Sequence, residues 1–198
     1  MKRIMGIAGL GLLWALLSST QAHGLRTMAT GLAPGLEKPG DIERAALSRA
    51  DFLIGEWEGE GWSQNVSGQR ERFWVKEFYR YRGDKDLMDM EGRFGDIRPD
   101  GTKSSEQEYA LGILFYDRES DKYLMWHYSG NGTVFTVNMD VDIKGKAAQY
   151  TRRNARGETS KFSLAIGEDG VWVSKIEILK SDKTWLQVME FRMKRVKS

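Results

Sequence analysis

The chain contains no cysteine and only two histidines among its 198 residues. Without cysteine it can form no disulfide, so its core alone must hold the fold. The same absence excludes a thiol enzyme, a thiolate-ligated metal protein and a lipoprotein anchored through an acylated cysteine.

No apolar run is long enough to span a membrane as a helix. The run from Ile4 to Leu17 falls short of the ~20 residues such a helix needs. Lys2 and Arg3 precede this run and small polar residues follow it up to Ala22, which is the order typical of a secretory signal peptide. We therefore expect cleavage after Ala22 and a periplasmic or secreted protein with no membrane attachment.

The rest of the chain divides into two parts. Residues 23–40 are glycine-rich and contain Pro34 and Pro39, which indicates a flexible leader. Residues 41–198 form one domain. The formal charge of the mature chain, residues 23–198, is balanced, because removing Lys2 and Arg3 leaves 28 basic and 28 acidic residues. A nucleic-acid partner would need a concentrated basic face, so we expect none.

The domain is predicted to be all-β. From Phe52 onward about ten segments with strand-like character alternate with glycine-rich and Asn- or Asp-containing turns. No long helix interrupts them, so the strands are expected to pair antiparallel in an up-and-down meander. A sheet of about 8–10 strands in so short a chain is expected to close into a barrel. A short helix, capped by Asp41, precedes it.

Alternation of side chains predicts which residues face the barrel interior. Over 133–143 the apolar residues share one face, and Asn138, Asp140 and Asp142 share the solvated face. Glu56, Glu58 and Glu60 lie opposite Trp57 and are expected to pair with Arg70 and Arg72 on the outside. Over 184–196, alternation gives one inward face to Trp185, Met189, Phe191, Met193 and Arg195.

Four segments carry a resemblance to a known family: 52–61, with its Gly55-Glu56-Trp57, then 112–117, 122–126 and 191–195. Together they resemble the bacterial lipocalin-like (DUF1579-type) β-barrel family, whose function is unsettled. The resemblance implies a lipocalin-like barrel in which Gly55 lets the backbone bend, Trp57 plugs one end and a basic residue of the last strand covers Trp57. Alternation favours Arg195 for this role, and Arg192 is the alternative if a bulge shifts the register.

A more distant similarity is to the nitrobindin-like barrels, which implies a haem bound by a histidine on a late strand. This chain has no histidine after His127, so we expect no cofactor. His127 itself is interpreted as an ordinary strand histidine rather than an axial ligand or general base. No metal site is expected either.

The methionines and aromatic residues assigned to the interior predict a pocket for a small apolar or amphipathic ligand, or equally a filled core. The expected contacts are Trp57, Met90, Phe135, Met139, Trp172 and Met189.

Two alternatives stay open. One is an isomerase- or hydrolase-type enzyme using Glu77, Tyr79 and Tyr81 inside the barrel. The other is a ligand-free structural domain, with a possible homodimer formed through strands that are apolar on both faces.

Overall fold

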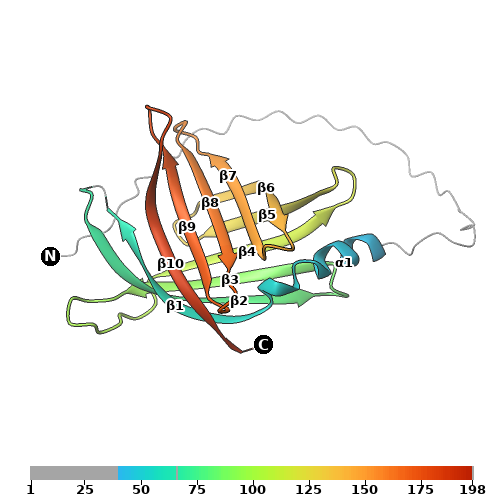
Figure 1. The fold of residues 1–198 in the computed structure, drawn as a ribbon, viewed down its shortest axis with the longest axis horizontal. Helices are drawn as coiled ribbons and strands as arrows, with labels where there is room; N and C mark the ends of the chain where they lie inside the picture. Colours follow the sequence, from blue (N-terminus) through green and yellow to red (C-terminus); the bar gives the residue numbers. More distant parts are fainter. Residues whose placement is uncertain (1–39, 66, 198) are drawn as a thin grey trace, which may run out of the picture. The chain divides into compact units, whose positions relative to one another are not determined.

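The computed structural model describes residues 40–65 and 67–197, so the expected signal peptide and all but the last residue of the leader lie outside the described residues. A short helix, α1 (Asp41–Ser48), and a 3₁₀ turn, η1 (Asp51–Leu53), precede ten strands (Figure 1). The strands are β1 (Gly55–Gln64), β2 (Arg70–Arg82), β3 (Leu87–Asp96), β4 (Glu108–Asp117), β5 (Lys122–Ser129), β6 (Val134–Asp142), β7 (Ala147–Arg153), β8 (Thr159–Ile166), β9 (Trp172–Leu179) and β10 (Trp185–Lys197).

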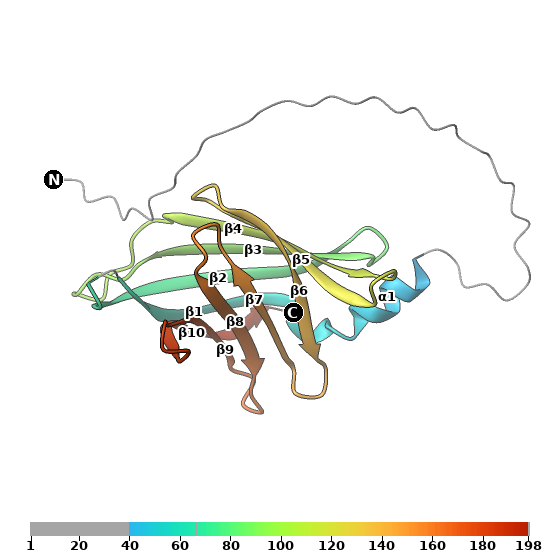
Figure 2. The same cartoon turned by 90° about the horizontal axis from the view of Figure 1, so that it is seen from above.

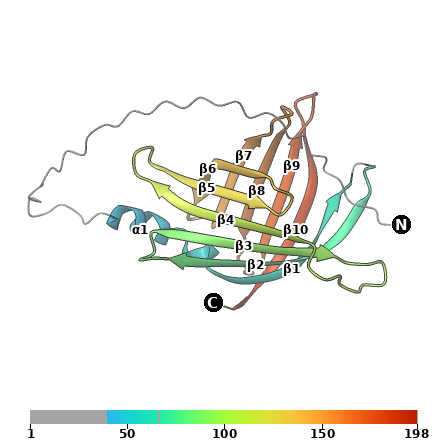
Figure 3. The ribbon, with the colours of Figure 1, turned by 180° about the vertical axis from the view of Figure 1, so that it is seen from behind.

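The ten strands form a closed antiparallel barrel, which confirms the predicted fold class. Each strand pairs with the next along the chain, and β1 pairs with β10 to close the cylinder. In Figure 3, β2 to β5 cross in front of β7 to β10. Some tight turns use glycine where the backbone needs a positive φ, as at Gly157 (82°) and Gly170 (73°), while others place Lys or Asp there.

The helix α1 packs against β3 and β4 at one end of the barrel (Figure 2). Tyr123 donates a hydrogen bond to the Ala46 carbonyl at 2.7 Å, and Tyr81 donates one to the Leu47 carbonyl at 3.1 Å. These bonds hold the helix against the barrel wall and cover this end.

The start of α1 differs from the prediction. Gly40, in the left-handed conformation, is the N-cap residue, and Asp41 is the first residue of the helix rather than its cap. The Asp41 carboxylate instead pairs with the Arg44 guanidinium one turn later. An acidic side chain in the first turn still interacts favourably with the helix dipole.

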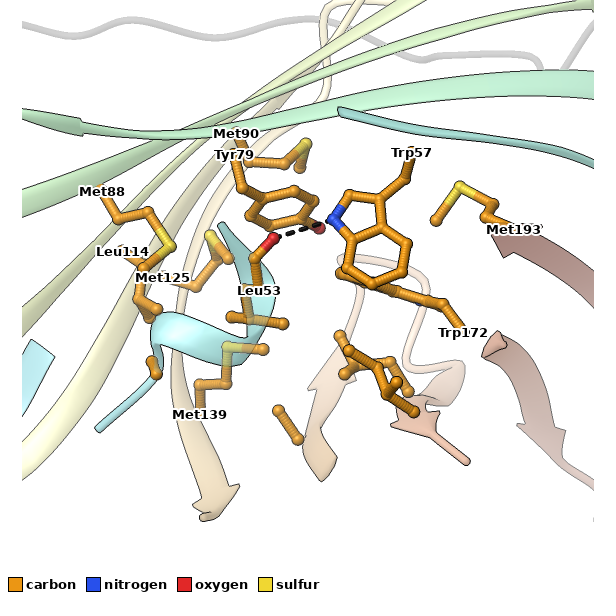
Figure 4. Packing of buried hydrophobic residues seen from close by; sticks show 14 of the residues in the cluster. Leu53, Trp57, Tyr79, Met88, Met90, Leu114, Met125, Met139, Trp172 and Met193 are labelled. Carbon is orange, nitrogen blue, oxygen red and sulfur yellow. Dashed lines mark hydrogen bonds between the residues drawn. The ribbon is translucent and has the colours of Figure 1, made fainter. Parts of the chain in front are cut away.

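The core fills the half of the barrel next to α1. Figure 4 shows Trp57, Tyr79 and Trp172 packed among methionines from several strands. The Trp57 and Trp172 rings meet edge to face with centroids 4.9 Å apart, and Trp57 Nε1 donates to the Leu53 carbonyl at 2.9 Å. The other buried side chains of this half include Met88, Met90, Leu114, Met125, Met139, Leu164 and Met193. We call this half the closed half.

One predicted face is wrong. The pairing of β10 with β9 shifts between Gln187 and Met189, which marks a bulge. A bulge inserts one residue and reverses the alternation beyond it. Trp185 therefore points outward, where the Lys161 ammonium lies 4.7 Å from its ring centroid, while Met189 stays inside.

The outer surface carries one of the expected ion pairs, Glu60 with Arg72 at 2.8 Å. Glu58 pairs instead with Lys76 at 2.7 Å. Arg70 does not join them, because its guanidinium stacks on the outward-facing Trp62 ring, 3.7 Å from the centroid.

The outward faces of β4 and β5 hold half-buried apolar side chains, namely Leu111, Ile113, Phe115, Leu124 and Trp126. The homodimer expected from such faces stays a prediction. Within the described part of the chain, no helix has the length and apolar character needed to cross a bilayer.

Candidate ligand site

The two halves of the barrel differ in how far solvent reaches the inward-facing side chains. In the closed half most of these side chains are buried, although Tyr123 and Val141 are half-buried. At the opposite end most are half-buried although they point inward, apart from the buried Phe73 and Phe191, so water reaches the inner wall there. We call this end the open mouth, and it is lined by Ser63, Phe94, His127, Phe135, Tyr150, Arg152, Phe162 and Met189.

One wall of the open mouth is a row of rings from four neighbouring strands. The His127 and Phe135 rings are stacked with centroids 4.7 Å apart. Phe135 lies 6.0 Å from Tyr150, and Tyr150 stacks on Phe162 at 5.1 Å. Ring pairs at such separations attract one another and present a continuous apolar surface. This wall can pack against a flat apolar molecule.

Arg152 points into the mouth beside this wall. Its guanidinium carbon lies 4.2 Å from the Phe135 ring centroid. Among the described residues no carboxylate lies within ion-pair distance of Arg152. Since no carboxylate of the described residues pairs with it, Arg152 is a cation available to a ligand.

His127 contributes a neutral polar group at the same place. Burial, and secondly the nearby Arg152 charge, lower the pKa of His127 to about 4. Its Nε2 lies 2.9 Å from Ser129 Oγ, so the two groups share a hydrogen bond. At neutral pH Arg152 is therefore the charged group of this wall, and His127 and Ser129 are uncharged hydrogen-bonding groups.

Below the mouth lies a buried acid, Glu77, whose side chain is 5% exposed. Tyr79 donates a hydrogen bond to Glu77 Oε2 at 3.0 Å, and no other described residue bonds to this carboxyl group. Burial raises the pKa of Glu77 to about 7, against a smaller lowering by Tyr79.

Tyr150 links the buried acid to the mouth. Burial raises its pKa to about 12, Arg152 lowers it and Glu77 raises it. Tyr150 therefore lies within electrostatic reach of both Arg152 and Glu77.

The rim of the mouth is acidic on the opposite side from Arg152. Glu71, Asp96 and Glu108 continue the inward faces of β2, β3 and β4 and are exposed. Glu71 accepts a hydrogen bond from Asn65 Nδ2 at 2.8 Å. Exposed charges of this kind are strongly screened by salt.

A second hollow lies on the outer surface rather than inside. This outer groove, of about 600 Å³, crosses β6 to β10 and includes Asp140, Asp142, Gln149, Ser163, Ala165, Val173, Lys175 and Arg192. It has no aromatic lining, so an aromatic body finds no stacking partner there.

The predicted contact residues fall into two groups. Phe135 and Met189 line the open mouth. Trp57, Met90, Met139 and Trp172 belong to the closed half, where Trp172 is 0% exposed and donates to Ser174 Oγ at 2.6 Å. A ligand in the mouth would reach these four only if the core moved.

The residues assigned to barrel closure lie together. The Arg195 guanidinium carbon is 4.5 Å from the Trp57 ring centroid, and Arg195 Nη2 donates to the Phe52 carbonyl at 2.7 Å. Gly55 has φ 133°, outside the range that side-chain-bearing residues favour. Arg192, the alternative to Arg195, points outward and pairs with Glu190 at 3.0 Å.

Sequence reasoning missed Tyr150, Arg152 and Phe162 as site residues. Alternation over Ala148, Tyr150 and Arg152 already indicates that these three share a face of β7. The short strand and the adjacent Arg153 hid this signal, because two neighbouring arginines suggest a solvated segment. No pattern in the sequence shows that Arg152 lacks an acidic partner.

Across residues 40–65 and 67–197, no cluster of three or more His, Asp or Glu side chains could hold a metal ion.

No protein-family model matches the chain. No curated protein matches it either. Two solved structures are similar in fold. One is Rv2717c from M. tuberculosis, with a TM-score of 0.57 and 13% identity, over 76% of this chain and 96% of that one. The other is the S-type phycobiliprotein lyase CpeS from Guillardia theta, with a TM-score of 0.51 and 9% identity, over 80% and 96%. These similarities support the barrel fold, and the DUF1579-type family stays a resemblance.

Proposed function

We propose that this protein binds a small amphipathic molecule in the open mouth of its barrel. The observation that carries the proposal is the contrast between the two halves: most inward side chains are buried next to α1, whereas the row from His127 to Phe162 at the mouth is half-buried. A barrel filled by its own side chains would be closed to solvent along its whole length. Trp57 and Arg195 would close the other end.

The chemistry of the lining supports an amphipathic ligand. The row from His127 to Phe162 offers flat apolar contact, while Arg152, Ser129 and Tyr150 offer polar groups at the same depth. Pockets of this kind combine an apolar lining with a few polar groups that fix the ligand's orientation. The similar fold of a protein named as a phycobiliprotein lyase agrees with small-molecule binding in such barrels.

Two serines on β8 give a matched test of the location. Ser160 faces the mouth, whereas Ser163 lines the outer groove, and both are half-buried. Nile red, a neutral flat dye, becomes fluorescent in apolar surroundings and serves as the probe. Ser160→Trp should weaken its binding at least about tenfold by filling the mouth, and Ser163→Trp should leave it unchanged.

The reverse pattern would place the site in the outer groove, and a wild-type protein that does not bind the dye would count against the proposal. Melting temperatures of both variants show whether they remain folded.

A proton-transfer activity is the second candidate function. Glu77 sits below the mouth with one carboxyl oxygen unbonded by described residues, and its pKa of about 7 suits an acid or base at neutral pH. The protein should then speed deuterium exchange at the methylene group of 2-naphthylacetone in D₂O, and Glu77→Gln should abolish that effect. Equal exchange rates with the wild type and the variant would remove this candidate.

Export is also proposed, because Lys2, Arg3 and the apolar run that follows have the order of a signal peptide. Protein purified from the periplasm or medium of its source should begin at His23. A chain that retains Met1 and stays in the cytoplasm would contradict export.

A further inference from the structure

We infer that the open mouth selects molecules that carry a carboxylate on a flat apolar body, and that Arg152 binds the carboxylate. This inference names the ligand class of the proposed function and rests on it. The charges inside the barrel, rather than the shape of the barrel, indicate this ligand class.

Arg152 is a cation without a counterion in the part of the chain that the structure describes. Several arginines on the outer surface, namely Arg72, Arg82 and Arg93, pair with carboxylates there. Arg152 is half-buried, lies on the inward face of β7 and stacks on the Phe135 ring. Holding a charge away from water costs free energy unless it is paired. A ligand carboxylate would supply the missing partner.

The stacking of Arg152 leaves its hydrogen-bond donors free. The guanidinium carbon lies over the Phe135 ring, and this cation–π contact engages none of its N–H donors in a hydrogen bond. The N–H bonds point outward in the guanidinium plane and match both oxygens of a carboxylate. Phe135 thus holds Arg152 in place without occupying the groups that would bind an anion.

The neighbours of Arg152 do not compete for it. His127 is uncharged at neutral pH and already shares its Nε2 with Ser129. Glu77 lies deeper, among the buried residues, and bonds to Tyr79. The aromatic row from Phe135 through Tyr150 to Phe162 begins at the guanidinium. A flat molecule packed against the ring edges of this row can therefore place a carboxylate at Arg152.

The acidic rim gives the main argument against this inference. Glu71, Asp96 and Glu108 would favour a cation at the entrance. These three carboxylates are exposed, however, and charges in water interact weakly at physiological salt. Arg152 is half-buried and acts at contact distance, where a charge-assisted hydrogen bond is strongest. We therefore expect the arginine to determine the preference.

Three naphthalene derivatives of nearly equal size test the inference: 2-naphthoate (anion), 2-naphthamide (neutral) and 2-naphthylmethylammonium (cation). Their dissociation constants are measured by calorimetry with the wild type and with Arg152→Gln, Arg152→Lys and Arg153→Gln. Arg153 is the matched control, because it is the next residue on β7, points outward and is exposed. Melting curves verify that each variant is folded.

The wild type should bind 2-naphthoate at least about tenfold more tightly than 2-naphthamide, as expected for a charge-assisted bond. Arg152→Gln should remove this ratio without weakening amide binding, Arg152→Lys should keep part of it, and Arg153→Gln should keep all of it. If 2-naphthamide binds as tightly as 2-naphthoate or more tightly, the inference is overturned while the proposed function stands. The same holds if the ammonium compound binds most tightly of the three. If none of the three compounds binds, both proposals fail.

Discussion

Tyr79 donates a hydrogen bond to the carboxyl group of Glu77 at 3.0 Å inside the barrel, two residues along the same face of β2. Both side chains are buried, and burial raises the pKa of Glu77 to about 7. An acid buried in this way keeps its proton at pH values where an exposed glutamate has lost it. The stability of the fold must therefore depend on pH through this residue.

The first prediction concerns Glu77→Gln and the free energy of unfolding. The pKa of Glu77 is raised from 4.5 to about 7. The favourable contribution of Glu77 to the free energy of unfolding is therefore fully present below pH 4.5 and is lost as the pH rises through 7. Glutamine cannot ionise and can still accept the Tyr79 hydrogen bond. Relative to the wild type, the variant should gain on the order of 2–3 kcal/mol between pH 4.5 and pH 8, measured by urea unfolding. A constant difference between the two proteins would contradict the prediction.

Glu58→Gln is the matched control for that experiment. Glu58 lies on the outer face of the neighbouring strand and pairs with Lys76 in solvent. Exposed pairs contribute at most about 1 kcal/mol, so this variant should follow the wild-type curve closely at every pH.

The second prediction concerns His127 and has the opposite sign. The pKa of His127 is lowered from 6.5 to about 4. The contribution of neutral His127 to the free energy of unfolding is therefore fully present above pH 6.5 and is lost as the pH falls toward 4. Relative to the wild type, His127→Gln should gain stability as the pH falls through this window. The effects of Glu77 and His127 oppose each other between pH 4.5 and 6.5, so the wild type should vary less with pH than either variant. An NMR titration that gives His127 an ordinary pKa would exclude this explanation.

The third prediction concerns the closed end. Arg195 both covers the Trp57 ring and donates to the Phe52 carbonyl. Arg195→Gln should lower the free energy of unfolding by about 1–2 kcal/mol, because it removes a cation–π contact and a charged hydrogen bond. Arg192→Gln, which affects only an outer pair with Glu190, should change it by less than about 0.5 kcal/mol. Equal effects would mean that Arg195 has no special role.

The fourth prediction concerns the close approach of β1 and β10. A Cβ atom at Gly59 would lie 1.8 Å from the Arg192 carbonyl oxygen, so the two strands would have to move apart. Gly59→Ala should lower the free energy of unfolding, measured by heat or urea, by about 3 kcal/mol. Gly167→Ala is the control, because there the nearest atom belongs to the movable Asp169 side chain. A stable Gly59→Ala protein would show that the barrel closes differently.

Much of the fold could be predicted from local sequence. Alternation assigned Phe135 and Met139 to the interior, and the Gly-rich turns separated ten strands that pair in order. The prediction was wrong for Trp185 because of the bulge between Gln187 and Met189. Apolar residues flank this bulge, so the sequence pattern does not reveal it. It failed to orient β4 because the outward Leu111 and Ile113 are as apolar as the inward Leu114.

Less of the candidate site could be predicted, because solvent access depends on all ten strands at once. Trp172 and Phe135 have the same apolar character and inward orientation, yet one is 0% exposed and the other half-buried. The difference arises from their neighbours, because Trp172 packs against Trp57 and Tyr79 in the core, whereas Phe135 lies in the row of rings at the mouth. Likewise, the sequence of β7 alone does not show which of Arg152 and Arg153 lacks an anionic partner. That depends on the side chains that the neighbouring strands place beside each arginine.

The central claim is that a small molecule enters the barrel at the end opposite α1, and NMR with bound 2-naphthamide tests it most directly. The account predicts nuclear Overhauser effects from the naphthalene protons to the Phe162 ring and the Met189 methyl group. Effects to the methyl groups of Ala165 and Val173 in the outer groove, without any to Phe162 or Met189, would contradict it.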